Sequence, residues 1–169
     1  MLGDLSRSPD LATPRIFIDA DACPVKEEVY RVGRRYGLKV LVVAGSFLMV
    51  PAEPGIERVI VEAGPDAADD WIAERAGAGD IVITADIPLA GRVLAAGGQA
   101  IGPTGRAFTS DSIGSALSSR ALGEHLRSMG EITRGPAPFR PQDRSQFLSA
   151  LDEAVHKARR AVPSSPRPG

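Results

Sequence analysis

The sequence predicts an α/β protein with a three-layer, doubly wound and mainly parallel sheet. Short apolar segments alternate with amphipathic ones along most of the chain, which is the order that repeated βα units produce. Several of the short segments are near-continuous runs of Val, Ile and Leu, as expected of strands that are buried on both faces. With 169 residues, of which 43% are hydrophobic, the chain can build one domain of this class with a real core.

The first predicted elements are a strand, a helix and a second strand. Arg15–Asp19 is short and apolar, and we expect a buried strand there. A helix is expected over Val25–Tyr36, because Pro24 suits a first helical turn and Gly37 suits a helix end. Leu38–Ala44 is then predicted as a strand that is buried on both faces.

The next elements continue the same alternation of apolar strands and amphipathic helices. The pattern predicts, in chain order, a strand at Arg58–Val61, a helix at Asp66–Ala76, a strand at Asp80–Ala85, a helix at Leu89–Ala96 and a possible last edge strand at Ala100–Ile101.

The C-terminal part is predicted to add extra helices to this sheet. We expect a broken helix around Ser110–Met129 and a final helix from about Gln142 to Arg160. Residues 15–160 are therefore predicted to form a single domain. Residues 1–14 are polar and irregular and are expected to form a flexible arm, and the proline-rich residues 161–169 a disordered tail.

Composition favours a cytoplasmic protein without membrane contact. No apolar run approaches the roughly 20 residues that a membrane helix needs. The first fourteen residues have no continuous apolar segment of the kind found in a secretory signal. The single cysteine, Cys23, excludes an intramolecular disulfide, which fits a reducing compartment. The sequence leaves the oligomeric state open.

Charge is distributed unevenly along the chain. Residues 1–86 carry nine basic and fifteen acidic side chains, whereas residues 87–169 carry eleven basic and six acidic ones. An acidic half could hold metal and a basic half could hold phosphate. Seventeen of the basic side chains are arginines, which suit bidentate phosphate binding. The alternative is that these charges only solvate the surface.

Five aspartates follow or face the ends of the predicted strands. In open parallel sheets, ligands bind outside the carboxyl ends of the strands. Asp19 and Asp21 follow the first strand, Asp66 and Asp69 open the helix after Val61, and Asp86 follows the strand of β-branched residues. Carboxylates packed together repel one another unless a cation joins them. We therefore expect a Mg²⁺ or Mn²⁺ site, although each aspartate alone also suits a helix cap or a turn.

Other side chains near this edge are candidates for substrate binding. Ser46 and Thr84 offer hydroxyls, and Arg106 and Arg144 offer guanidinium groups for phosphate. The hydroxyls could equally satisfy local backbone groups, and the glycine- and proline-rich segment that ends at Arg106 also fits a plain turn. Cys23 is expected to be a small buried residue rather than a nucleophile.

The sequence resembles the YaiI/YqxD family of uncharacterised bacterial proteins over about residues 15–157. The likeness is carried by the strings Asp19-Ala-Asp-Ala-Cys-Pro24, Gly64-Pro-Asp-Ala-Ala-Asp69 and Gly79-Asp-Ile-Val-Ile-Thr-Ala-Asp-Ile-Pro-Leu-Ala90, with Gly102-Pro-Thr-Gly-Arg106 and the later Asp143-Arg144 in support. That family looks like a branch of the PIN-like domains, many of which are metal-dependent ribonucleases.

The resemblance implies a PIN-like fold and a divalent-metal-dependent nuclease that acts on phosphodiester bonds, with RNA as the favoured substrate. Asp19, Asp66 and Asp86 are then the expected catalytic residues and direct metal ligands. Asp21 and Asp69 are expected to bind a second metal ion or to support the first set of ligands.

Two other functions stay open at this point. The first is a phosphatase of the haloacid-dehalogenase kind, with Asp19 as the nucleophile and Asp21 as the acid and base. A well-placed lysine for that chemistry is lacking, because the chain has only Lys26, Lys39 and Lys157. The second is a non-catalytic module that binds RNA or a protein partner.

Overall fold

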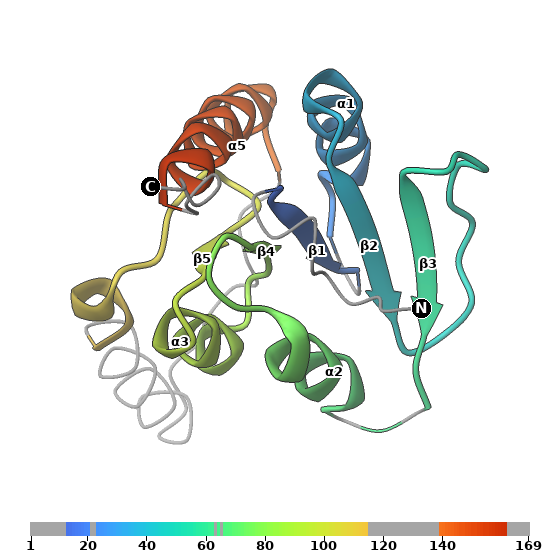
Figure 1. Ribbon diagram of the computed structural model, residues 1–169, viewed down its shortest axis with the longest axis horizontal. Coiled ribbons are helices and arrows are strands. Elements are labelled where there is room, and N and C mark those ends of the chain that lie inside the picture. The colour runs from blue at the N-terminus through green and yellow to red at the C-terminus, as the bar shows by residue number, and fades with distance from the viewer. Residues whose placement is uncertain (1–12, 21–22, 63, 65, 115–138, 162–169) are drawn as a thin grey trace, which may run out of the picture.

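A five-stranded sheet forms the centre of the molecule. The computed structural model describes residues 13–20, 23–62, 64, 66–114 and 139–161 of the chain. Every strand is parallel to its neighbours, in the order β3-β2-β1-β4-β5 (Figure 1). The strands are β1 (Arg15–Asp19), β2 (Lys39–Ala44), β3 (Ile56–Ile60), β4 (Ile81–Ile83) and β5 (Gln99–Ile101).

Helices cover both faces of this sheet, which confirms the predicted three-layer, doubly wound class. α1 (Lys26–Tyr36) and α5 (Pro141–Ala161) lie on one face, and α2 (Ala67–Arg75) and α3 (Ile87–Ala95) lie on the other (Figure 1). The direction in which the chain adds strands reverses between β1 and β4. Ligands of open α/β sheets bind in the crevice at such a switch point.

Two apolar cores result from the alternation of side chains along the strands. On β1, Ile16 and Ile18 are fully buried with α1 and α5, whereas Phe17 is buried with α2 and α3. On β2, Val40 and Val42 join the first core and Leu41 and Val43 join the second. Each such side chain contributes about 1.5–3 kcal/mol when it is fully buried. This explains why the central strands read as unbroken apolar runs.

Two glycines determine where helix α1 ends and how closely it packs on the sheet. Gly37 caps the helix in the left-handed conformation, with φ at 67°, and its N–H donates to the Arg34 carbonyl. Gly33 faces β2, where a Cβ would lie 2.7 Å from Val40 Cγ2. A side chain at position 33 would therefore push the helix away from the strand.

Three predicted boundaries were wrong by two residues. β4 ends at Ile83 rather than at Ala85, so Thr84 and Ala85 follow the strand. β3 starts at Ile56 rather than Arg58, because this edge strand exposes Glu57 and Arg58 and so lacks a continuous apolar signal. α3 starts at Ile87, two residues before the predicted start, because a proline in its first turn is compatible with the helix.

The remaining predicted elements agree with the structure where it describes them. α5 spans the predicted final helix, and a helical turn begins at Ser110. The rest of the predicted broken helix, most of the N-terminal arm and the C-terminal tail lie outside the described residues, so these predictions stay predictions. In the described part of the chain, every helix is too short or too polar to span a bilayer.

Candidate functional site

One threonine connects two of the predicted acids at the switch point of the sheet. Asp19 is the last residue of β1, and Thr84 follows directly after β4. The Thr84 hydroxyl donates to Asp19 Oδ2 at 2.8 Å and accepts from the Asp86 backbone N–H at 2.9 Å. The Thr84 side chain is itself buried. Its hydroxyl therefore fixes the positions of both acidic residues relative to each other.

Asp86 also caps the following helix. It occupies the N-cap position of α3, and its Oδ1 accepts from the Leu89 N–H at 2.8 Å. The capping role considered from the sequence is therefore real for this residue. This capping bond leaves other acceptor positions of the carboxylate open to a ligand, because its two oxygens offer about four. Asp66 differs, since it stands at the N-cap position of α2 without a side-chain capping bond.

Helix α2 brings Asp69 into the electrostatic field of the other acids. Burial raises the pKa of Asp69, and the carboxylates of Asp86, Asp19, Asp66 and Asp70 raise it further, from 3.8 to about 6. The charges that raise this pKa come from Asp19 at the end of β1, from Asp66 and Asp70 at the start of α2, and from Asp86 after β4. These are the three segments in which the sequence analysis expects acids, and their charges reach Asp69.

A cavity of about 280 Å³ opens beside these acids. Asp19, Thr84 and Asp86 line it, together with Cys23, Ile83, Ala85 and Pro103. The Cys23 thiol is buried, and its pKa is raised, first by burial. The thiol therefore stays protonated at neutral pH, which agrees with the expectation of a structural cysteine rather than a nucleophile.

The donor chemistry fits a hard divalent cation. The cavity and its surroundings present carboxylate oxygens, which Mg²⁺ and Mn²⁺ prefer. Among the described residues, no three Asp, Glu, His or Cys side chains are close enough together to enclose an ion. Mg²⁺ is commonly bound by one or two carboxylates plus water and substrate phosphate, so two carboxylates suffice. Asp21 lies outside the described residues.

Of the four predicted substrate-binding residues, only Thr84 lines this cavity, and Ser46, Arg106 and Arg144 do not. Ser46 is exposed two residues after β2, and Arg106 is exposed in the turn after β5. That turn is closed by the hydrogen bond from Gly102 N–H to the Arg106 carbonyl, at 2.9 Å. Arg144, on α5, donates from Nη1 to Glu28 Oε2 at 2.5 Å. The arginine is thus held by a buried acid of α1.

Glu28 was missed by the sequence analysis. Its side chain is buried on the face of α1 that packs against the sheet and α5. The signal was present, because Glu28 is three residues from Val25 and four from Val32, both of which are core residues. A carboxylate at a core position of an amphipathic helix indicates a buried ion pair.

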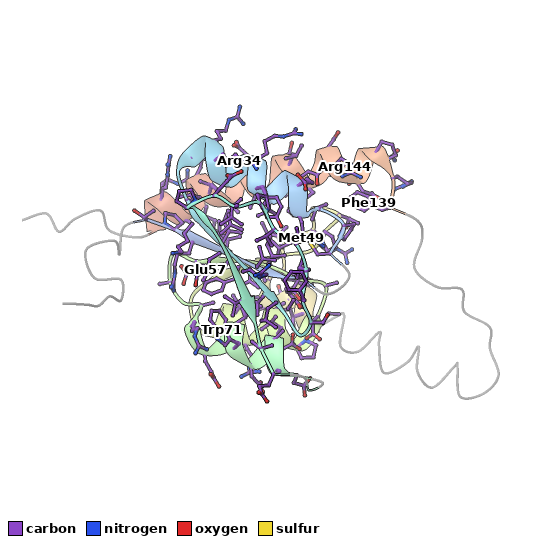
Figure 2. All side chains as sticks on the ribbon, turned by 90° about the vertical axis from the view of Figure 1, so that its right-hand side faces the viewer. Arg34, Met49, Glu57, Trp71, Phe139 and Arg144 are labelled. Atoms are coloured by element: carbon purple, nitrogen blue, oxygen red, sulfur yellow. The ribbon has the colours of Figure 1, made fainter. Side chains whose placement is uncertain are left out.

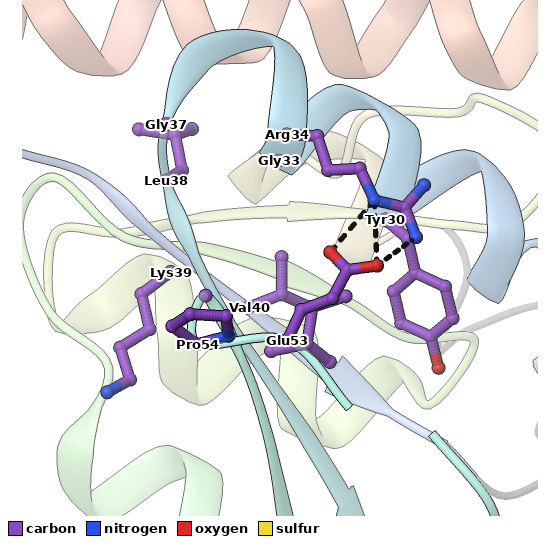
Figure 3. A pocket seen from close by; sticks show the side chains of 11 residues that line it. Tyr30, Gly33, Arg34, Gly37, Leu38, Lys39, Val40, Glu53 and Pro54 are labelled. Carbon is purple, nitrogen blue, oxygen red and sulfur yellow. Dashed lines mark hydrogen bonds and ion pairs between the residues drawn. The ribbon is translucent and has the colours of Figure 1, made fainter. Parts of the chain in front are cut away.

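A second cavity lies at the other end of the strands. It has a volume of about 530 Å³ and is lined by the end of α1 and the beginnings of β2 and β3. The guanidinium of Arg34 and the carboxylate of Glu53 face each other across it, with three N–O contacts between 2.7 and 3.1 Å (Figure 3). None of the predicted site residues lines it.

The raised pKa of Asp69 leads to a prediction about stability. Its carboxyl binds a proton more tightly in the folded protein, at about 6, than in the unfolded chain, at 3.8. Its ionisation therefore destabilises the fold as the pH rises through this window. Asp69→Asn is expected to raise the free energy of unfolding by about 1 kcal/mol at about pH 8, after allowance for solvent screening, and by much less at about pH 4. Urea unfolding at both pH values measures this.

Asp70→Asn is the matched control for that experiment. Asp70 is exposed on the same helix and forms an ion pair with Arg92 at 2.8 Å. Its replacement removes the same charge but breaks a favourable contact, so no gain in stability is expected. Equal stability of the wild type and Asp69→Asn at high pH would contradict the crowding of carboxylates.

Comparisons with known proteins agree with the resemblance seen in the motifs. Residues 17–157 match the model of a family described as "Uncharacterized BCR, YaiI/YqxD family". A UPF0178 protein of Caulobacter sp. (strain K31) is 69% identical over 147 residues, which cover 87% of this chain and 97% of the relative. A UPF0178 protein of Rhodopseudomonas palustris (strain HaA2) is 55% identical over 157 residues, covering 93% and 96%. No solved structure matches the chain.

Proposed function

The chain belongs to the YaiI/YqxD family, and we propose that it is a divalent-metal-dependent nuclease that hydrolyses phosphodiester bonds, with RNA as the favoured substrate. The observation that carries this proposal is the placement of Asp19 and Asp86 at one cavity at the switch point of the sheet, where burial first and the neighbouring carboxylates second raise the pKa of Asp69 to about 6. Such a cluster is costly without a cation and is stabilised by one.

Asp19 and Asp86 are the residues that we propose as the principal metal ligands. Both line the cavity, and both contact the Thr84 hydroxyl, which donates to the Asp19 carboxylate and accepts from the Asp86 backbone N–H. Asp66, just before α2, and Asp69, on its first turn, would supply further oxygens. Asp21 would do the same. When bound, Mg²⁺ or Mn²⁺ supplies a water of lowered pKa and neutralises charge on the phosphate.

The chain's own groups would prepare this site in two ways. The bond from Thr84 to Asp19 and the capping bond of Asp86 hold both carboxylates before any ligand arrives, which lowers the entropic cost of binding. Asp69 would hold a proton near pH 6 and release it when the positive charge of a cation stabilises its carboxylate. The PIN-like resemblance supports the same reaction class.

A direct assay tests the proposal. The purified protein is incubated with a short, unstructured, end-labelled RNA in millimolar Mn²⁺, in Mg²⁺ or in excess EDTA, and the products are separated on a denaturing gel. We expect cleavage with either metal and none in EDTA. Thermal unfolding in parallel should show stabilisation by Mn²⁺, because an ion that binds only the folded state raises its stability.

The same experiment also tests the alternative function, that of a phosphatase. p-Nitrophenyl phosphate and RNA are offered side by side, together with acid trapping of a phosphorylated protein. Turnover of the phosphate monoester with a trapped phosphate on Asp19 would replace the nuclease by a phosphatase. RNA binding without cleavage in any metal would leave a non-catalytic binding module instead.

A further inference from the structure

The pair formed by Glu28 and Arg144 has an unusual arrangement of satisfied and unsatisfied atoms. The Glu28 side chain is 4% exposed, and its Oε2 accepts from Arg144 at 2.5 Å. Its other oxygen, Oε1, is buried and has no hydrogen-bond partner. A half-satisfied buried carboxylate costs free energy, so a purely structural contact would be better served by an apolar residue.

The Arg144 side chain is held by Glu28 and Phe139 but remains partly accessible to solvent. Its guanidinium carbon lies 5.0 Å from the centre of the Phe139 ring, and Figure 2 draws both side chains at the beginning of α5. Even so, the Arg144 side chain is 47% exposed. Within the described part of the chain, Glu28 is the one acceptor of its five N–H groups. The remaining donors lie in the plane of the guanidinium of this half-exposed side chain.

Two observations relate this pair to the acid cavity, one electrostatic and one from the packing of α5. The charge of Glu28 acts on the thiol of Cys23, which lines the cavity with Asp19. From the other side, the turn that carries Pro103 packs against α5 at Gln146, two residues beyond Arg144. The helix that carries Arg144 therefore borders the turn that lines the cavity, while Arg144 itself is not among the lining residues.

We infer that Glu28 is a positioning residue, which holds Arg144 so that its free N–H groups bind a backbone phosphate of the nucleic acid beside the cleavage site. This inference rests on the proposed nuclease function. An arginine that stacks on a ring and is held by one carboxylate loses little further freedom when it binds phosphate. The acids would bind the reacting phosphate through metal, and Arg144 a neighbouring one.

The two neighbouring glutamates of α1 give a test in which the signs of the effects differ. Glu27 and Glu28 share the first turn of the helix, but Glu27 is exposed and has no contact with Arg144. Replacing either by glutamine removes one negative charge near a polyanion. The electrostatic field alone therefore predicts tighter RNA binding for both variants. If Glu28 positions Arg144, Glu28→Gln must instead weaken binding, by about fivefold, whereas Glu27→Gln must not.

Binding is measured by fluorescence anisotropy with a fluorescein-labelled single-stranded RNA in Mn²⁺, over a series of salt concentrations. All variants carry Asp19→Asn, so that the RNA is not cleaved during the titration. Arg144→Gln is expected to weaken binding and to reduce the slope of log Kd against log salt by about 0.7, the value for one phosphate contact to a single strand. Arg144→Lys should keep the slope but bind more weakly than arginine.

A structural role would give a different result. Arg159, near the other end of α5, also links this helix to α1, since it donates to the Tyr36 carbonyl. Arg159→Gln is the control for lost helix contact, and it should leave the Arg144-dependent part of the salt slope unchanged. If Glu28→Gln and Arg144→Gln both bind RNA with the affinity and the salt slope of the Asp19→Asn parent, this inference alone is overturned. Absence of any RNA binding both by the wild type and by the Asp19→Asn parent would overturn the proposed function as well.

Discussion

Asp19→Asn is expected to lower the rate of metal-dependent RNA cleavage by a factor on the order of 10² to 10³, the largest effect on activity of any single change. The substitution keeps the shape of the side chain and an oxygen that can accept the Thr84 hydroxyl, which donates at 2.8 Å in the wild type. What it removes is negative charge at the end of β1. A metal ligand supports several kcal/mol of transition-state stabilisation, and each 1.36 kcal/mol corresponds to a tenfold change in rate. Single-turnover cleavage of labelled RNA in Mn²⁺ measures the effect.

Asp70→Asn controls for the loss of charge in this experiment. Asp70 lies on α2 beside Asp69, but its carboxylate is exposed and paired with Arg92 of α3. Its removal should leave cleavage close to the wild-type rate. Thermal unfolding of Asp19→Asn should also show a weaker response to Mn²⁺ than the wild type does. Cleavage at an undiminished rate by Asp19→Asn would remove this residue from the proposed site.

The sequence predicts the elements of this fold well wherever a strong local signal exists. β1 was predicted to the residue because its buried centre, Ile16 to Ile18, is continuously apolar and is bounded by the charged Arg15 and Asp19. The end of α1 at Gly37 followed from the need for a left-handed residue. β3 was misplaced because it lies at the edge of the sheet, where Glu57 and Arg58 are exposed and the apolar pattern is broken.

The candidate site could be predicted in outline but not in its contacts. Asp19 and Asp86 follow strands, so topology alone brings them to one edge. No local pattern indicates that one hydroxyl, on Thr84, joins both. Nor could it show that Arg144 pairs with Glu28, because these residues are 116 positions apart and meet only when α5 packs on α1. Pairings across such distances depend on the complete tertiary structure.

Gly105→Ala is expected to cause a large loss of stability. Gly105 has φ at +95°, which a residue with a side chain rarely adopts. A Cβ there would also lie 2.7 Å from the Gln146 carbonyl oxygen and 3.0 Å from the Phe147 nitrogen, both of them backbone atoms of α5. Backbone strain of about 1 kcal/mol and overpacking of about 1–3 kcal/mol add up to a loss of roughly 2–4 kcal/mol. Urea unfolding, followed by circular dichroism, measures it.

Gly37→Ala separates the two contributions. Gly37 also has a positive φ, of 67°, but a Cβ there would meet no atom within 4 Å. Its replacement should therefore cost only the backbone term, about 1 kcal/mol. If Gly105→Ala and Gly37→Ala lower the free energy of unfolding equally, the turn at Gly105 does not pack closely against α5. The contact also bears on the proposed function, because the same turn carries Pro103 at the cavity and packs against α5, the helix that carries Arg144. A Gly105→Ala protein that still folds in the cold should therefore lose RNA affinity, whereas folded Gly37→Ala should keep it.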